Sequence, residues 1–301
     1  MRRLLNYSKQ SEVKSNDMAE LTNTQKIQQA ELSLLKVFMD FCRQHNLRWY
    51  MVGGSLIGTM RHKGFVPWDD DIDIGMPRPD YDRFVNMQEQ YPKGYSIMNH
   101  TNTPDWHFNF SQFCDDESEI IIHMNEKPRK CKVWIDIFPQ DGSPNNKLHR
   151  WLHIKRIMMY RHLIQIAHLR TQVKKNVETR PWYESMILKI LHYVPVGKLI
   201  NSEKLLKKMD KYLRKQSYEG SVFAGNYLGR YREKGILPME WWAPAVWRDF
   251  EDTQVSCPND TDSLLTHFYG NYMKMPPEEK RISHYAEIVK LREYEKNEQN
   301  Q

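Results

Sequence analysis

Apolar residues recur along the chain with two spacings, one typical of helices and one typical of strands. Between residues 22 and 45 they return every three or four positions, which predicts a helix with one apolar face. The residues of that face are Leu32, Leu35, Phe38, Met39 and Cys42. Shorter apolar runs predict strands at residues 48–52, 71–76, 95–98, 107–113, 120–123 and 133–138.

Other segments have helical spacing or turn residues. Helices are predicted at residues 56–61, 79–90, 182–193 and 201–216 and within 143–177, and a turn is predicted at 139–142. The order of elements predicts an α/β (α+β) fold, in which helices flank a small mixed sheet and the C-terminal part is mainly helical. We divide the chain into a polar, flexible segment 1–20, a catalytic core 21–142, a helical and mixed part 143–289, and a charged tail 290–301.

Composition narrows the class of protein. The chain has 301 residues, of which 40% are hydrophobic and 27% charged, as in globular proteins. A net charge of +6 is too small an excess to indicate nucleic-acid binding. No run approaches the roughly 20 apolar residues of a membrane span, and no secretory signal follows the first residues. We therefore expect a cytoplasmic protein.

The four cysteines are scattered without a paired motif, as in reduced intracellular proteins. Zinc binding by His107, Cys114, His123 and Cys131 is an alternative, but their spacing does not match common zinc sites.

The strongest chemical signal is an acidic strand. Because side chains alternate along a strand, Asp71 and Asp73 are expected on one face, about 7 Å apart. Two neighbouring carboxylates repel each other unless a cation lies between them, and carboxylate oxygens suit Mg²⁺ or Mn²⁺. Asp136 interrupts a later apolar strand and is expected to complete the metal site. A buried acid with its own partners is the plain alternative for Asp136.

Gly53, Gly54 and Ser55 follow a predicted strand and open a short helix. Backbone N–H groups at such a turn can bind phosphate, although a simple turn is the alternative. The acidic run also imitates the start of an EF-hand loop, but Ile74 stands where that loop needs Gly and Asp80 where it needs Glu.

Three blocks of sequence together resemble the LicD family, which includes bacterial phosphocholine transferases and is related to fukutin-type proteins. They are residues 51–74 (MVGGSLIGTMRHKGFVPWDDDIDI), 134–139 (WIDIFP) and 269–281 (YGNYMKMPPEEKR), the last followed by His284. One departure is Asn271, where the family more often has Asp.

The resemblance implies a nucleotidyltransferase-like fold and transfer of a phospho-alcohol to a cell-surface glycan. The favoured reaction moves phosphocholine from CDP-choline to a hydroxyl of lipopolysaccharide, teichoic acid or capsule, with release of CMP. One alternative is a true nucleotidyltransferase that moves NMP from an NTP and releases pyrophosphate. Another is a non-catalytic scaffold that binds a glycan or nucleotide. The head group, the acceptor and the oligomeric state are left open.

Further residues are candidates for ligand contacts. Arg61, Lys63 and Arg281 are expected to contact phosphate, with ordinary solvated charge as the alternative. Trp68 is expected to stack on a base or on choline, or else to plug the acidic loop. His284 is expected to close the site or donate a proton, or else to be structural.

A basic segment suggests a membrane partner. Residues 143–177 contain eight Lys or Arg and no acidic residue, and residues 198–215 are also basic. They are expected to face an anionic membrane at its inner face, or a lipid-linked glycan acceptor. A solvated basic surface is the alternative.

Overall fold

The computed structural model describes six segments of the chain. They are residues 21–104, 106, 108–123, 128–167, 201–281 and 286–293. Several expectations fall outside these residues: the segment 1–20, the helix at 182–193, most of the tail 290–301, His107 and His284.

The described residues form an eight-stranded sheet, and a separate two-stranded one. The central order is β1-β2-β5-β4-β10, with β3 also on β4, β6 on the far end of β5, and β7 on β6. Only β2 and β5 are parallel. The large sheet consists of β1 (Tyr50–Met51), β2 (Asp73–Pro77), β3 (Tyr95–Met98), β4 (Ser111–Ile122), β5 (Arg129–Ser143), β6 (Phe223–Gly225), β7 (Ile236–Pro238) and β10 (Ala286–Lys290). The expected α+β class with a mixed sheet is confirmed.

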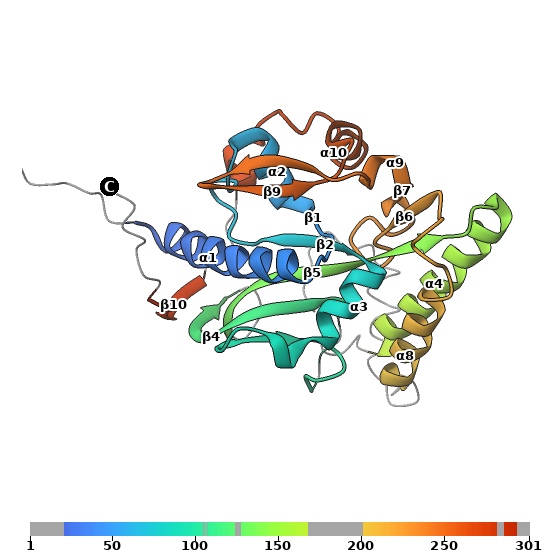
Figure 1. The fold of residues 1–301 in the computed structure, drawn as a ribbon, viewed down its shortest axis with the longest axis horizontal. Coiled ribbons are helices and arrows are strands. Elements are labelled where there is room, and N and C mark those ends of the chain that lie inside the picture. Colours follow the sequence, from blue (N-terminus) through green and yellow to red (C-terminus); the bar gives the residue numbers. More distant parts are fainter. Residues whose placement is uncertain are drawn as a thin grey trace, which may run out of the picture.

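Helices surround this sheet (Figure 1). The α-helices are α1 (Asn23–Gln44), α2 (Gly53–His62), α3 (Arg78–Asn86), α4 (Lys147–Ala167), α8 (Ser202–Leu213), α9 (Met239–Trp242) and α10 (Thr261–Tyr269). Short 3₁₀ turns are η1 (Gln88–Gln90), η2 (Arg232–Gly235) and η3 (Glu278–Lys280). None of the described helices is both long and apolar enough to cross a lipid bilayer.

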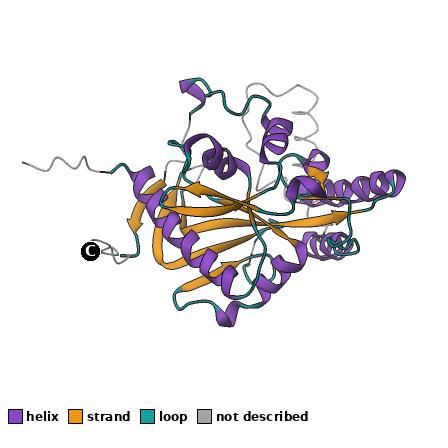
Figure 2. Ribbon diagram, turned by 45° about the horizontal axis from the view of Figure 1, so that its top comes forward, coloured by secondary structure: helices purple, strands orange, loops and turns teal. Residues whose placement is uncertain are grey.

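The first helix begins at a capping box, in which Thr22 and Gln25 satisfy each other's backbone N–H groups. Figure 2 shows helices lying across the strands of the sheet. The ring of Phe38 lies 5.3 Å from Phe84 of α3 and 6.3 Å from Phe113 of β4, measured between ring centroids. These aromatic contacts join α1, α3 and the sheet in one core.

The β8–β9 hairpin (Val246–Phe250 and Thr253–Cys257) packs beside β1 and the end of α2. Trp247 contacts Trp49 edge to face at 6.0 Å, and Phe250 contacts Phe65 at 5.0 Å. The hairpin therefore supports the β1–α2 unit, on which the candidate site is built.

Two details of the sheet differ from the sequence prediction. The turn predicted at residues 139–142 is wrong, because β5 runs through it: Pro139 pairs with Met76 of β2 and Gly142 with Ala224 of β6. Pairing with distant segments on both sides outweighs the local turn preference of these residues. The strand predicted to begin at Asp71 begins at Asp73, so Asp71 belongs to the preceding loop.

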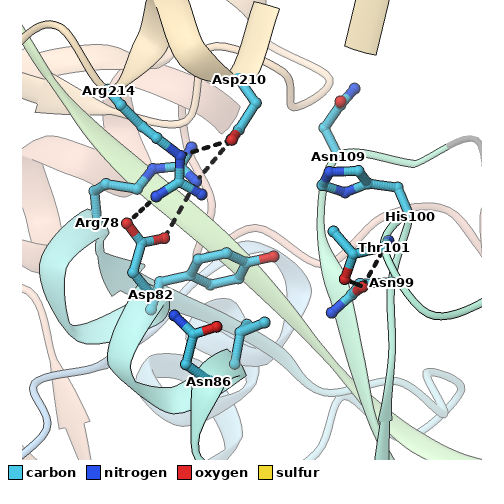
Figure 3. A pocket seen from close by; sticks show the side chains of 11 residues that line it. Arg78, Asp82, Asn86, Asn99, His100, Thr101, Asn109, Asp210 and Arg214 are labelled. Atoms are coloured by element: carbon cyan, nitrogen blue, oxygen red, sulfur yellow. Dashed lines mark hydrogen bonds and ion pairs between the residues drawn. The ribbon is translucent and has the colours of Figure 1, made fainter. Parts of the chain in front are cut away.

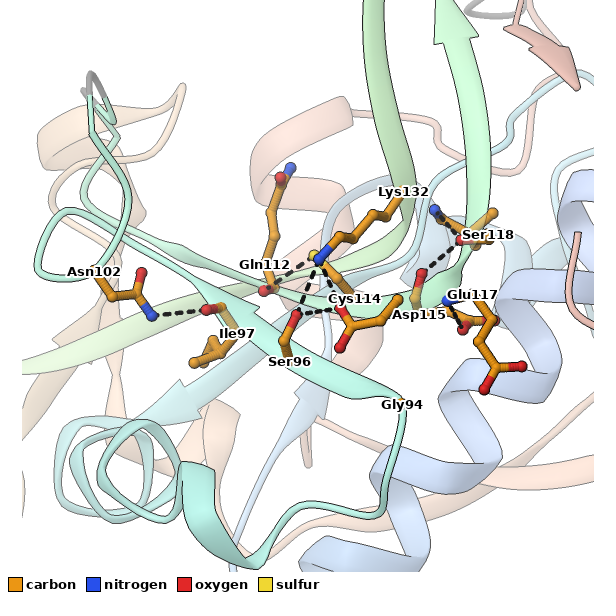
Figure 4. A network of polar contacts seen from close by, with 12 residues as sticks. Gly94, Ser96, Ile97, Asn102, Gln112, Cys114, Asp115, Glu117, Ser118 and Lys132 are labelled. Carbon is orange, nitrogen blue, oxygen red and sulfur yellow. Dashed lines mark hydrogen bonds and ion pairs between the residues drawn. The ribbon is translucent and has the colours of Figure 1, made fainter. Parts of the chain in front are cut away.

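The strands predicted at residues 107–113 and 120–123 belong to one strand, β4, interrupted by a bulge between Asp115 and Ile120. Side chains satisfy the backbone there (Figure 4). Ser118 Oγ donates to the Asp115 carbonyl and accepts from the Val133 N–H, each at 2.7 Å. Arg292 donates to the Asp115 carboxylate at 2.9 Å, which ties the last described segment to the sheet.

A second apolar cluster lies where α4 packs on α8. It is joined to the sheet through Arg78, at the start of α3. Arg78 forms a bidentate pair with buried Asp141 on β5 at 2.6 and 2.7 Å, and contacts Asp210 of α8 at 3.3 Å. The division at residue 142 stays a prediction; β5 continues through that position.

We predict that Arg78→Ala lowers the free energy of unfolding by about 3–5 kcal/mol, because it leaves Asp141 buried without its cation. Arg43→Ala is the control. It removes an exposed pair with Asp40 and should cost less than about 1 kcal/mol. Urea unfolding measures both, and equal effects would contradict the buried-pair account.

Candidate active site

The site is built around the turn that leads from β1 into α2. The helix begins at Gly53, which has φ +60°, a conformation that residues with a Cβ rarely adopt. A Cβ on Gly53 would collide with the carboxylate of Asp73, and one on Gly54 would lie 2.6 Å from Asp69 Oδ2. Both glycines are therefore needed to let the N-terminus of α2 approach the acidic loop.

The acidic loop is held from two sides. On one side, Ser55 Oγ accepts the N–H of Asp73 at 2.8 Å and donates to the Asp71 carbonyl at 3.2 Å. On the other side, Gln28 of α1 donates to the Asp69 carbonyl at 2.7 Å. The Ser55 hydroxyl thus fixes the backbone between Asp71 and Asp73.

The two strand carboxylates are neighbours. Asp73 on β2 is the register partner of Asp136 on β5, and neighbouring strands lie about 4.8 Å apart. On the other side of Asp136, Gln112 of β4 donates to its Oδ1 at 2.8 Å. Asp73, Asp136 and Gln112 therefore occupy adjacent positions on three consecutive strands.

The carboxylate of Asp73 lies in an unfavourable electrostatic environment. Burial raises the pKa of Asp73 well above its ordinary value, and the charges of Asp71, Asp136 and Asp69 raise it further. A backbone hydrogen bond from Gly54 acts in the opposite direction. Mutual repulsion is therefore a property of the cluster itself.

Glu31 adds another acid from α1. Its side chain is only 2% exposed, and Oε2 has no hydrogen-bond partner. Burial, followed by the charges of Asp71 and Asp70, raises the pKa of Glu31 well above its ordinary value. The acidic cluster thus draws members from β2, β5, the loop and α1.

The donor set fits a hard divalent cation. Carboxylate oxygens are the ligands that Mg²⁺ and Mn²⁺ prefer, and a bound cation would offset the burial and the neighbouring negative charges that together raise the pKa of Asp73. Across the residues that the structure describes, no three His, Cys, Asp or Glu side chains already converge into a ready-made metal site. Ligand binding would then have to draw the carboxylates closer together.

A basic and aromatic flank lies beside the acidic loop. The guanidinium of Arg281 lies over the ring of Trp68, 5.2 Å from its centroid. Arg61 donates to the Tyr272 carbonyl at 3.0 Å, and burial, followed by the charge of Arg281, lowers its pKa. Lys63 is exposed at the C-terminal end of α2, about 15 Å along the helix from Gly53.

A separate pocket of about 130 Å³ lies between α3, α8 and the segment after β3 (Figure 3). Its lining includes the charged residues Arg78, Asp82, Asp210 and Arg214, which bridge one another. None of the acids of the candidate site lines it. This pocket therefore belongs to the junction between the helices and is not part of the candidate active site.

Comparison with known proteins finds similarity to one family. The family model described as "LicD/FKTN/FKRP, nucleotidyltransferase domain" matches residues 46–178. The chain is 27% identical over 270 residues to the lipopolysaccharide cholinephosphotransferase LicD of Haemophilus influenzae, covering 85% of this chain and 93% of that protein. Residues 46–178 therefore carry a LicD-family domain.

Two shorter matches involve uncharacterized proteins. One from Rickettsia typhi is 28% identical over 118 residues, which is 38% of this chain and 36% of that protein. One from Rickettsia prowazekii is 31% identical over 65 residues, which is 21% of this chain and 24% of that protein. The matched LicD-family domain holds Gly53, Asp73 and Asp136, whereas Glu31 and Arg281 lie outside it.

Sequence reasoning missed Glu31, Gln28 and Gln112. The buried stripe of α1 is Ile27, Ala30, Glu31, Leu34, Leu35, Phe38, Phe41 and Cys42. Leu32 and Met39, assigned to that face, are only half-buried. Glu31 could have been identified from the sequence, because it is a charged residue at an apolar position of the helical repeat. Gln28 and Gln112 carry no comparable signal.

We predict that Glu31→Gln increases stability more at pH 8 than at pH 5. Folding raises the pKa of Glu31 above its ordinary value of about 4.5. As the pH rises past that value, Glu31 ionises in the unfolded state first, and the free energy of unfolding falls. Gln cannot ionise, so the gain over wild type should grow by at least about 1 kcal/mol between the two pH values. Urea unfolding in EDTA measures it, with exposed Glu89→Gln as control. An equal gain at both pH values would contradict the prediction.

Proposed function

We propose that this chain is a phosphotransferase of the LicD type that transfers phosphocholine from CDP-choline to a hydroxyl of a glycan such as lipopolysaccharide. The relative from Haemophilus influenzae supports the reaction and the acceptor class. The observation that carries the proposal is the pairing of Asp73 with Asp136 beside the Gly53–Gly54 turn. A carboxylate pair next to a helix N-terminus suits a phosphate-bearing donor.

Asp71, Asp73 and Asp136 are the residues proposed to hold Mg²⁺ or Mn²⁺. The cation would supply charge neutralisation for the donor diphosphate. Burial and then the charges of Asp71 and Asp136 raise the pKa of Asp73, and the charge of a bound cation would offset both effects, which supports this assignment.

The other candidate residues are proposed to bind and orient the donor. Backbone N–H groups of Gly53 and Ser55 are proposed to face donor phosphate, while the Gly54 N–H keeps its bond to the Asp73 carboxylate and the Ser55 hydroxyl keeps its contacts with the loop. Arg281 and Trp68 are proposed to line the nucleotide side of the site. Lys63 and His284 stay predictions.

Asp136 is proposed to accept the proton of the attacking glycan hydroxyl. Gln112 donates to one of its oxygens and so orients the carboxylate. The hydroxyl oxygen forms a bond to the outer phosphorus, the bond from that phosphorus to the CMP oxygen breaks, and CMP leaves. Positioning and charge neutralisation supply most of the acceleration.

We predict that Asp71→Asn abolishes transfer and the thermal stabilisation by Mg²⁺ or Mn²⁺, while the metal-free protein stays folded. Saturating metal should raise wild-type stability by a few kcal/mol, about 2.7 at 100 times Kd. Asp252→Asn is the control, since Asp252 is an exposed residue paired with Lys36 on the surface.

Product analysis separates the reactions. CMP from CDP-choline supports the proposal, whereas pyrophosphate from an NTP indicates a nucleotidyltransferase. Neither product would indicate a non-catalytic scaffold. Wild-type turnover by Asp71→Asn that still requires metal would contradict the role of Asp71.

We also propose that the protein works at the cytoplasmic face of an anionic membrane and docks through α4. Four large apolar side chains of this helix are between 49% and 62% exposed: Leu148, Trp151, Leu152 and Met159. Exposed Lys155 lies among them, and α4 contains no acidic residue. An apolar stripe with only positive charges suits the surface of an anionic bilayer, where a lipid-linked glycan would be presented.

We predict that the full chain sediments with vesicles containing phosphatidylglycerol and not with phosphatidylcholine vesicles, and that L148Q/L152Q/M159Q abolishes sedimentation. Val222→Gln, at another exposed apolar position, is the control and should sediment as wild type. Sedimentation of the triple variant at the wild-type level would contradict docking through α4. Loss of a wild-type dimer in the triple variant would instead assign this face to self-association.

A further inference from the structure

Three aromatic side chains form a ledge at the end of α10. The ring of Tyr231 is stacked on Phe268, with centroids 4.3 Å apart and planes 24° apart. Tyr269 stands almost perpendicular to Tyr231, at 81° and 5.7 Å. The side chain of Tyr269 is 37% exposed, so solvent or a ligand can reach it.

The ledge lies close to the acidic cluster. Burial raises the pKa of Tyr269, the hydrogen bond with Tyr231 raises it further, and the charge of Asp73 adds to the effect. Just beyond the ledge, the Tyr272 carbonyl accepts a hydrogen bond from Arg61 at the end of α2. The same helix meets Asp73 at its other end. The segment after the ledge therefore contacts α2, the helix whose N-terminus forms the proposed phosphate site.

The chemistry of this surface is apolar and aromatic. Met273 and Met275 follow the ledge and are 53% and 39% exposed. Ring faces and thioethers offer little to the hydroxyls of a polyol such as ribitol or glycerol, which need hydrogen-bond partners. They suit methyl groups that carry a diffuse positive charge, because ring faces attract cations.

The arrangement of the rings favours a rounded group over a flat one. A nucleobase stacks best on a ring face or between parallel rings, but one face of Tyr231 is already covered by Phe268. The planes of Tyr231 and Tyr269 are nearly perpendicular, so a tetrahedral group can contact both rings at once.

We propose that Tyr231 and Tyr269 form the subsite for a quaternary ammonium head group of the donor, and so select choline over uncharged alcohols. The inference rests on the proposed function, since it names the head-group subsite of the same reaction.

The test measures binding of three ligands to the full chain with Mg²⁺ by calorimetry. They are CDP-choline, CDP-3,3-dimethylbutanol, which has the shape of CDP-choline without its charge, and CMP. Wild type should prefer CDP-choline to the neutral analogue by about tenfold. Tyr269→Leu should weaken CDP-choline by about tenfold and leave CMP unchanged, whereas Tyr269→Phe, which keeps the ring, should bind as wild type.

Trp151→Leu is the matched control, because Trp151 is an exposed aromatic residue on α4, a helix that contributes no residue to the proposed donor site, and the assay contains no membrane. It should change none of the affinities. Equal wild-type affinity for CDP-choline and the neutral analogue would overturn the inference, even if a Tyr269 variant fails to fold. An equal loss of CMP binding in Tyr269→Leu would assign the ledge to the base and also overturn it. If wild type binds neither CMP nor CDP-choline, the proposed function itself fails.

Discussion

Repulsion between the carboxylates of Asp73 and Asp136 is the constraint that explains the architecture around them. Ionised acids on neighbouring strands oppose folding unless other forces hold them in place. Here the parallel pairing of β2 with β5 fixes their backbones, and the Gly54 N–H bonds to the Asp73 carboxylate. Glu31 increases the strain from α1, because it buries another carboxylate beside the same cluster. Such a concentration of negative charge lowers the stability of the fold. Binding of a divalent cation and a diphosphate at this site would explain why the acids are clustered there.

The remainder of the fold secures these positions. The aromatic core between α1, α3 and β4 fixes the back of the sheet, so the strands cannot spread to relieve the repulsion. Buried Arg78 connects β5 to α8. Because α4 packs on α8, this contact also links the sheet to the helix with the exposed apolar stripe. The segment after α10 returns to α2 through the Arg61 contact with Tyr272. Segments that are distant in sequence therefore border the same site, as the positions of Glu31 and Arg281 illustrate.

Local patterns predicted the parts of the structure that local forces determine. The helix ending near His45 was located within a residue at both ends, because one apolar stripe and a capping box specify it. Asp136 was expected beside Asp71 and Asp73 because it interrupts an apolar strand, but the parallel register that makes it the partner of Asp73 was not predicted. The path of β5 through Pro139 was not predicted either, since its partners in β2 and β6 come from distant segments. The ledge at Tyr231 was also beyond prediction, because it is assembled from a turn and a helix end that only the tertiary structure brings together.

The row of carboxylates at Asp73 and Asp136 is proposed to be a divalent-metal site. Anomalous diffraction from crystals grown with Mn²⁺ and a CDP-alcohol tests this most directly, since it locates the metal without any assumption about the reaction. We expect an anomalous peak within coordination distance of the Asp73 and Asp136 carboxylate oxygens, close to the roughly 2.0–2.1 Å typical of Mg²⁺, next to the donor diphosphate. A donor bound in the Gly53–Gly54 turn with no peak between these acids, or with the metal elsewhere, would contradict it.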